Sequence, residues 1–159
     1  MAYIYPAPGV SGVQATLSVT VAANGSDTGL SVPALQDVTV NNANDVFTWT
    51  QLDATAKKQI ATTSTNSLAM NIVLDQTVFF GDSSDSDTNS ATYFGIFTLS
   101  KNKTKVSFSL YFGDTDGGAT GKTVTGSGYI TGLAPTVSAD APVWVSPITL
   151  TVDGEYTVS

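Results

Sequence analysis

Strict alternation of apolar and polar residues is the dominant pattern along this chain. In its clearest instance, residues 104–112, every second position is apolar, namely Val106, Phe108, Leu110 and Phe112. Because successive side chains of a β-strand point to opposite faces, this alternation predicts a half-buried antiparallel strand. Residues 15–21 and 68–74 alternate in the same way and are also predicted to be strands.

Shorter segments of the same character extend the strand prediction over most of the chain. Residues 148–152 alternate again and precede Asp153-Gly154, a pair typical of a two-residue turn, so a carboxy-terminal hairpin with residues 155–158 is predicted. Pro147 marks an edge or a bulge, because proline cannot donate a hydrogen bond to a strand ladder. The remaining predicted strands lie at residues 38–40, 46–52, 124–131 and 142–145.

One flanking helix is predicted, from Ser90 to Lys101. Asn89 or Ser90 suits the N-cap, where a side-chain oxygen accepts a hydrogen bond from a free backbone amide. Asn102 suits the end of the helix, because asparagine tolerates the left-handed conformation found there. The inner face of this helix would carry three aromatic side chains, Tyr93, Phe94 and Phe97.

Two features complicate the helix prediction. Gly95 and Ile96 lower the helix propensity of the segment, so a strand and hairpin over the same residues is an alternative. A second, weaker helix signal spans residues 53–61, where Asp53 suits the N-cap and Ala56 and Ile60 would face a core.

The chain is predicted to be an amino-terminal arm, residues 1–12, followed by a single domain, residues 13–159. Turn-forming residues predict a long loop at 23–37 and a polar loop at 81–90. The first of these loops contains three apolar residues, Leu30, Val32 and Leu35. They are expected either to fold back onto the chain's own core or to dock onto a neighbouring molecule.

Composition excludes several classes of function. The 159-residue chain has a net charge of −7, and its six basic residues are all lysine, so the arginine forks that read guanine or clamp phosphate are absent. The sequence contains neither histidine nor cysteine, which excludes Ser-His-Asp and Cys-His catalysis and zinc sites built on those residues. No catalytic residues and no cofactor are expected, and the chain is predicted not to be an enzyme. The sequence shows no export signal and no apolar run long enough to span a bilayer.

Two acidic loops supply the only constellation of ligand-type side chains. Their carboxylates could bind calcium, which prefers oxygen ligands, but neither loop has the twelve-residue pattern of an EF-hand. Solvated acidic loops are the alternative, and no metal site is predicted. The residues concerned are Asp82, Asp85 and Asp87 in one loop and Asp114 and Asp116 in the other.

The second half of the chain resembles the tail tube (major tail) protein family of long-tailed bacteriophages. The resemblance rests on the order of its segments: the helix 90–101, the strand 104–112, the acidic link 113–118, the Gly-Tyr-Ile segment 126–137, and the closing residues 148–156. It implies a mainly β fold, an antiparallel β-sandwich or flattened barrel with one short flanking helix. It also implies a structural virion protein, made in the host cytoplasm, whose hexameric rings stack into a hollow tube for DNA passage during ejection.

The resemblance further implies partners and assembly residues. Other copies of the chain, a tape-measure protein and other tail proteins would be partners, while DNA would pass without specific binding and no membrane would be involved. The amino-terminal arm and the loop 23–37 would bridge stacked rings, so deleting residues 1–10, or changing both Leu30 and Val32 to Asp, should leave a folded monomer that cannot stack. The candidate assembly residues are Tyr3, Tyr5, Leu30, Val32 and Leu35, and the five aspartates above are candidate lumen or loop residues.

Two alternative functions are a capsid decoration or other virion structural protein, and a calcium- or carbohydrate-binding β-sandwich module. A carbohydrate-binding module would gather exposed aromatic side chains at one loop end. Trp49 and Trp144 instead lie inside predicted strands, which favours packing in the core.

Overall fold

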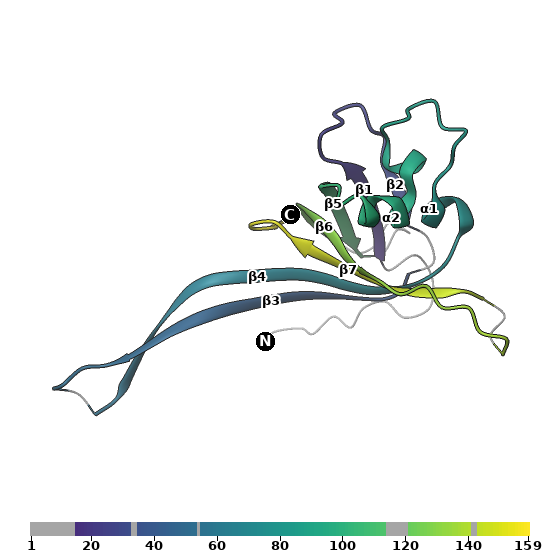
Figure 1. Ribbon diagram of the computed structural model, residues 1–159. Helices are drawn as coiled ribbons and strands as arrows, with labels where there is room; N and C mark the ends of the chain where they lie inside the picture. The colour runs from purple at the N-terminus through teal and green to yellow at the C-terminus, as the bar shows by residue number, and fades with distance from the viewer. Residues whose placement is uncertain (1–14, 33–34, 54, 114–120, 141–142) are drawn as a thin grey trace.

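The chain folds as one antiparallel eight-stranded sheet with two helices over one of its faces (Figure 1). The computed structural model describes residues 15–32, 35–53, 55–113, 121–140 and 143–159. The elements are β1 (Ala15–Val21), β2 (Leu30–Val32), β3 (Leu35–Thr50), β4 (Lys57–Val73), α1 (Gln76–Phe80), α2 (Ala91–Lys101), β5 (Val106–Phe112), β6 (Lys122–Leu133), β7 (Val145–Val152) and β8 (Thr157–Val158).

The strands follow the order β2–β1–β5–β6–β7–β4–β3, and β8 pairs with β6. The mainly β, antiparallel fold and its flanking helix α2 are therefore confirmed. Within that class the sheet is a single layer whose path ends at β2 and β3 and does not close. Those two strands are the free edges of the described sheet.

The predicted alternation gives the sheet one apolar face. Across it, Leu17 of β1 lies opposite Leu110 of β5, which lies opposite Val124 of β6. The helices lie over this face and add Phe79 and Ile96 to the same buried cluster (Figure 1). Each large apolar side chain buried in this way contributes roughly 1.5–3 kcal/mol to folding.

Helix α2 begins and ends where the sequence predicts. Ser90 is the N-cap, and its hydroxyl oxygen accepts a hydrogen bond from the backbone N–H of Tyr93 at 3.0 Å. Gly95, with φ 70° and ψ 166°, divides the helix at a kink. The predicted inner face is right for Phe94, which packs against the core, and wrong for Phe97, which is exposed beyond the kink. The fully buried side chains of the helix are Ala91, Ile96 and Leu99.

The weak helix signal at residues 53–61 is wrong, because β4 begins at Lys57 and continues to Val73. It pairs with β3 from Leu35↔Ile72 to Thr50↔Lys57, so the two strands form one long hairpin. The threonine-rich stretch 62–65 favours this outcome, since branching at Cβ suits a strand better than a helix.

The predicted carboxy-terminal hairpin is also wrong. After β7 the chain bends at Asp153 and Gly154 and continues as β8, which pairs with the first half of β6 through Val124↔Val158. The second half of β6 pairs with β7. β7 and β8 therefore lie one after the other along the same side of β6.

Helix α1 was not predicted, and a single aspartate caps it. The Asp75 carboxylate accepts hydrogen bonds from the Thr77 hydroxyl at 2.6 Å and from the backbone N–H groups of Thr77 and Val78 at 3.0 and 3.1 Å. The Thr77 hydroxyl bond, followed by the Val78 amide bond, lowers the pKa of Asp75 below 3.8. The charged form of the cap is therefore stabilised in the folded chain.

We expect Asp75→Ala to lower the free energy of unfolding by about 1 kcal/mol at pH 7, the usual contribution of an N-cap. Because the folded pKa lies below the unfolded value of 3.8, this contribution is present above that value and is lost as the pH falls through the folded pKa. Urea denaturation of both chains at pH 7 and pH 3 measures the difference. Asp140→Ala, at an exposed loop position, is the control. A difference that does not shrink at pH 3 would contradict the capping role.

Candidate functional site

The hairpin of β3 and β4 extends far beyond the rest of the sheet (Figure 1). Pairing between β4 and β7 ends at Ser67↔Thr151, so residues 57–66 of β4 have β3 as their only neighbouring strand. At about 3.3 Å per residue, this part is about 33 Å long. We call residues 42–66 the hairpin extension; a two-stranded ribbon of this kind is marginally stable alone in water.

The hairpin extension exposes large apolar side chains. Phe47 retains 60% of its exposure and Ile60 retains 56%, and the two lie directly opposite each other across the ribbon. Trp49 is half-buried on the same face and stacks on Phe47, with ring centroids 6.0 Å apart. We call Phe47, Trp49 and Ile60 the extension patch. The other face exposes Val46, and Leu52 is exposed at the tip.

A β-bulge separates the extension patch from the base of the ribbon. Between Asn44↔Ser64 and Val46↔Ala61 the strand β4 has one residue more than β3. Asp45 holds this bulge, because its carboxylate accepts a hydrogen bond from the Thr63 hydroxyl at 2.9 Å and its carbonyl oxygen accepts one from Thr62 at 3.2 Å. Bulges increase the local twist of a ribbon. The bulge thus fixes how the extension patch is turned relative to the sheet.

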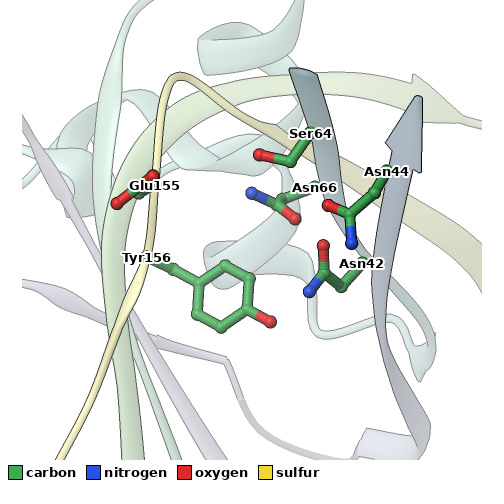
Figure 2. Close-up of a pocket in the computed structure, with 6 residues that line it drawn as sticks. All are labelled: Asn42, Asn44, Ser64, Asn66, Glu155 and Tyr156. Carbon is green, nitrogen blue, oxygen red and sulfur yellow. The ribbon is translucent and has the colours of Figure 1, made fainter. Parts of the chain in front are cut away.

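A polar groove of about 330 Å³ lies at the base of the hairpin extension, where the apolar face of the sheet ends (Figure 2). Asn66 is 5% exposed and donates to the carbonyl oxygen of Gly154 at 3.3 Å, while its own Oδ1 has no partner among the described residues. With amides, two hydroxyls and a single carboxylate, the lining forms no nucleophile–base pair. The lining residues are Asn42, Asn44, Ser64, Asn66, Glu155 and Tyr156.

The face of the sheet away from the helices is rich in hydroxyl groups. One row crosses four strands through Ser31, Ser18, Ser109 and Thr125, which lie opposite one another in turn. A second row crosses Tyr129, Thr151, Ser67 and Asn41. We call this surface the hydroxyl face. An ion pair of Lys105 and Asp153, 2.7 Å apart, lies beyond the strand ends.

A second apolar surface lies at the opposite end of the sheet. Trp144 retains 50% of its exposure and Val137 retains 62%, and Val143 is also exposed. We call these three residues the Trp144 patch. The prediction that both tryptophans pack in the core is therefore wrong: Trp144 precedes the first residue of β7, and Trp49 lies in the hairpin extension.

The structure buries two of the candidate assembly residues in the chain's own core. Leu30 is 4% exposed and Val32 is 3% exposed, because β2 pairs with β1 and turns both side chains toward the helices. Leu35 is partly buried against the same core. This is the first of the two alternatives for the region 23–37, whose loop is shorter than predicted. An aspartate at position 30 or 32 would place a charge in the core, so such variants are not expected to be folded monomers.

The loop between α1 and α2 uses its carboxylates to hold its own turns. Asp82 accepts from the Ser84 hydroxyl at 2.6 Å, which lowers the pKa of Asp82, and also from the Ser84 N–H at 2.9 Å. Asp85 accepts from the backbone N–H of Asp87 at 2.9 Å. Asp87 in turn accepts from the Asn24 side chain at 2.7 Å, joining this loop to the loop before β2. The loop lies on the helix side of the sheet (Figure 1).

Among the described residues, no group of three or more acidic, histidine or cysteine side chains is arranged to hold a metal ion. Asp114 and Asp116 lie outside the described residues, as do Tyr3 and Tyr5 of the amino-terminal arm. The role of these four residues and the boundary of the arm stay predictions. Within the described part of the chain, no helix has the length and apolar character needed to cross a membrane.

Sequence comparisons give no relatives: no protein family model matches the chain, and no curated protein sequence matches it. Solved structures do match. A chain of the tail of an empty GTA particle, refined with C6 symmetry, has a TM-score of 0.62 at 12% sequence identity, covering 90% of this chain and 95% of that chain. A chain of the six-fold symmetrised baseplate of the anti-feeding prophage has a TM-score of 0.64 at 10% identity, covering 98% and 97%.

The SPP1 tail tube also matches, with a TM-score of 0.63 at 13% identity, covering 97% of this chain and 80% of that chain. At these identities the similarity shows a shared fold. The resemblance to tail tube proteins drawn from the sequence is therefore confirmed for the fold.

Proposed function

We propose that this chain is a structural subunit of a phage-type tail tube, in which six copies close into a ring and rings stack into a hollow tube that conducts DNA. The shared fold supports the proposal along most of the chain's length. The matching GTA tail was refined with C6 symmetry and the matching baseplate with six-fold symmetry, and the SPP1 match is itself a tail tube.

The observation that carries the proposal is the hydroxyl face. A surface that passes DNA without holding it needs polar groups that water wets and few positive charges that would bind phosphate. The hydroxyl face meets both requirements, because serine and threonine dominate its rows and arginine is absent from the sequence. We place this face toward the lumen and the helices toward the outside of the tube.

With this orientation, the acidic loop 81–90 does not face the lumen. The loop between α1 and α2, which carries Asp82, Asp85 and Asp87, lies on the helix side of the sheet (Figure 1). In the proposed tube they lie on the outer side, and the lumen wall is hydroxylic.

The two sheet edges support ring closure. Edge strands carry backbone N–H and C=O groups that pair readily with another chain. β2 and β3 are the two ends of the described sheet, so side-by-side pairing of copies would join the sheets into one continuous inner wall. The tape-measure protein and the other tail proteins are the remaining proposed partners, and the virion tail is the proposed location.

Electron microscopy of the purified protein over a concentration series tests this function. We expect rings at low concentration and hollow tubes at high concentration, with six-fold end views. A reconstruction with resolved side chains should place Ser109 and Thr125 on the channel wall. A chain that stays monomeric at every concentration, or a tube without a channel, would overturn the proposal and favour a decoration protein.

A further inference from the structure

We infer that the extension patch of one copy docks onto the Trp144 patch of another, so that the chain associates head to tail. The inference deepens the proposed function by naming the residues of one contact between copies. Its physical basis needs only two copies of the chain and does not depend on a tube.

The two patches lie at opposite ends of one strand. β4 runs from Lys57 in the hairpin extension to Val73, and Val73 lies opposite Val145, the residue after Trp144. The sixteen steps along β4 correspond to about 53 Å. Because the patches are so far apart, they cannot cover each other within one molecule, as Figure 1 also shows.

Both patches expose side chains that folding usually buries. The extension patch offers a stacked aromatic pair, Phe47 and Trp49, with Ile60 beside it. The Trp144 patch offers an indole together with the exposed Val137 and Val143, and Trp144 and Val137 are at least half exposed. Large aromatic side chains of this kind are the usual anchors of protein interfaces.

The backbone that carries Trp144 is fixed in place. Its carbonyl oxygen accepts a hydrogen bond from the backbone N–H of Leu74 at 2.9 Å. The next residue, Val145, pairs with Thr136 through two backbone hydrogen bonds of 2.8 and 3.3 Å. A side chain presented by an ordered backbone loses little conformational entropy on binding. The Trp144 patch is therefore suited to receive a partner.

Charge favours pairing of unlike patches. Lys57 and Lys58 lie beside the extension patch, and the Lys58 amine donates to the neutral side chain of Gln51 at 2.5 Å. The only ion pair in the described part of the chain involves neither lysine. Asp140, an exposed residue, lies in the segment that carries the Trp144 patch. Docking of unlike patches brings Lys58, which lies opposite Trp49, toward Asp140, whereas docking of two extensions would bring the Lys58 residues of both copies together.

Symmetry also distinguishes docking of unlike patches from docking of two identical patches. Contact between two identical patches closes a two-fold dimer, and growth stops there. Contact between unlike patches leaves one free patch at each end, so further copies can add. The two unlike patches at opposite ends of this chain therefore suit continued assembly.

A mixing experiment tests the inference. Phe47→Asp blocks the extension patch and Trp144→Asp blocks the Trp144 patch, and both side chains are at least half exposed, so the two variants should fold. Each variant alone should sediment as the basic unit, monomer or ring, because its one intact patch finds no intact counterpart. The mixture should contain a species of twice that mass. In the otherwise native chain, Trp144→Ala should weaken association by at least about 30-fold.

Two results of the mixing experiment would overturn the inference. Association of the Trp144→Asp variant with itself would show that extensions pair with extensions. Native-like assembly of both variants would show that the two patches do not form the contact between copies. A native chain that associates head to tail without forming a channel would leave this inference standing and remove the proposed function. Tubes that form despite both substitutions would support the proposed function and remove this inference.

Disulfide trapping provides a second readout that uses fully folded chains. The native sequence has no cysteine, so Phe47→Cys and Trp144→Cys each carry one thiol. Mild oxidation should crosslink the mixture and neither variant alone. Thr48→Cys, on the opposite face of β3, is the matched control and should not crosslink to Trp144→Cys.

Discussion

A chain with a shortened β3–β4 hairpin should fold normally and form no tubes. Replacing residues 44–64 by Asn-Gly joins Ala43 to Thr65, which lie opposite each other in the native register, through a two-residue turn. The deleted residues pair with no strand outside the hairpin, so the melting temperature should stay within about 5 °C of the native value. The concentration needed for assembly should rise at least about a hundredfold, because two or more apolar anchors are removed.

Light scattering over a concentration series, together with electron microscopy, measures this effect. Thr48→Asn is the matched control, because it changes a side chain of the ribbon away from the extension patch. It should assemble at nearly the native concentration. Normal tubes from the shortened chain would show that the hairpin extension is dispensable for assembly.

Gly95→Ala should destabilise the fold by more than about 4 kcal/mol, a large part of the 5–15 kcal/mol that typical domains possess. Gly95 and Gly81 both have positive φ, at 70° and 95°, with ψ near 160°, a region that is essentially restricted to glycine. The two residues also meet backbone to backbone. A Cβ on Gly95 would collide with the backbone nitrogen of Gly81, which no side-chain rotation can relieve.

Alanine variants of two other glycines separate the cost of the positive φ from the cost of the backbone collision. Gly154 has φ 90°, and a Cβ at this position would meet nothing within 4 Å, so Gly154→Ala should cost only about 1 kcal/mol for the left-handed backbone. Gly25 has open space and no positive φ, so Gly25→Ala should be nearly neutral. Urea denaturation of the three variants measures the series. Equal costs for Gly95→Ala and Gly154→Ala would contradict the close contact between α1 and α2.

The sequence predicts best the elements that have one buried face. Strand β5 shows perfect alternation because Val106, Phe108 and Leu110 must all face the core. The start of α2 was predictable because Ser90 makes the cap through its own side chain. For α1, the Asp75 cap was the available signal, but five residues are too few for a helical period to show.

The hairpin extension was predicted only in part, as a strand at residues 46–52, and the rest was missed for a related physical reason. Both of its faces are exposed in the single chain, so no core imposes a period of two on residues 42–66. The run of alanine and lysine around Lys57 and Lys58 has high helix propensity, which produced the wrong helix at residues 53–61. Pairing with β3 overrides this preference. The aromatic and β-branched residues at 46–50 supported the predicted strand 46–52, and those at 62–65 were the unused signal for β4.

The sequence indicated that apolar residues would take part in contacts between copies, but it did not locate the residues that are exposed. Apolar residues in a region rich in turn signals were correctly noticed at Leu30 and Val32, but sequence alone could not decide whether their own core or a neighbour covers them. Trp144 was placed in the core because it lies inside the predicted strand 142–145. It is exposed because β7 begins only at the residue that follows it.

The pairing of β1 with β5 has a consequence for how the chain is made. β1 can pair with β2 once residues 30–32 exist, but Ser18 also lies opposite Ser109, so its other neighbour, β5, is absent until the ribosome has synthesised residues up to about 112. At roughly 5–20 residues per second, β1 waits roughly 5 to 20 seconds after its own synthesis for β5. A hairpin forms within microseconds once both strands exist. The β3–β4 ribbon therefore has time to pair on the nascent chain before the rest of the sheet has assembled.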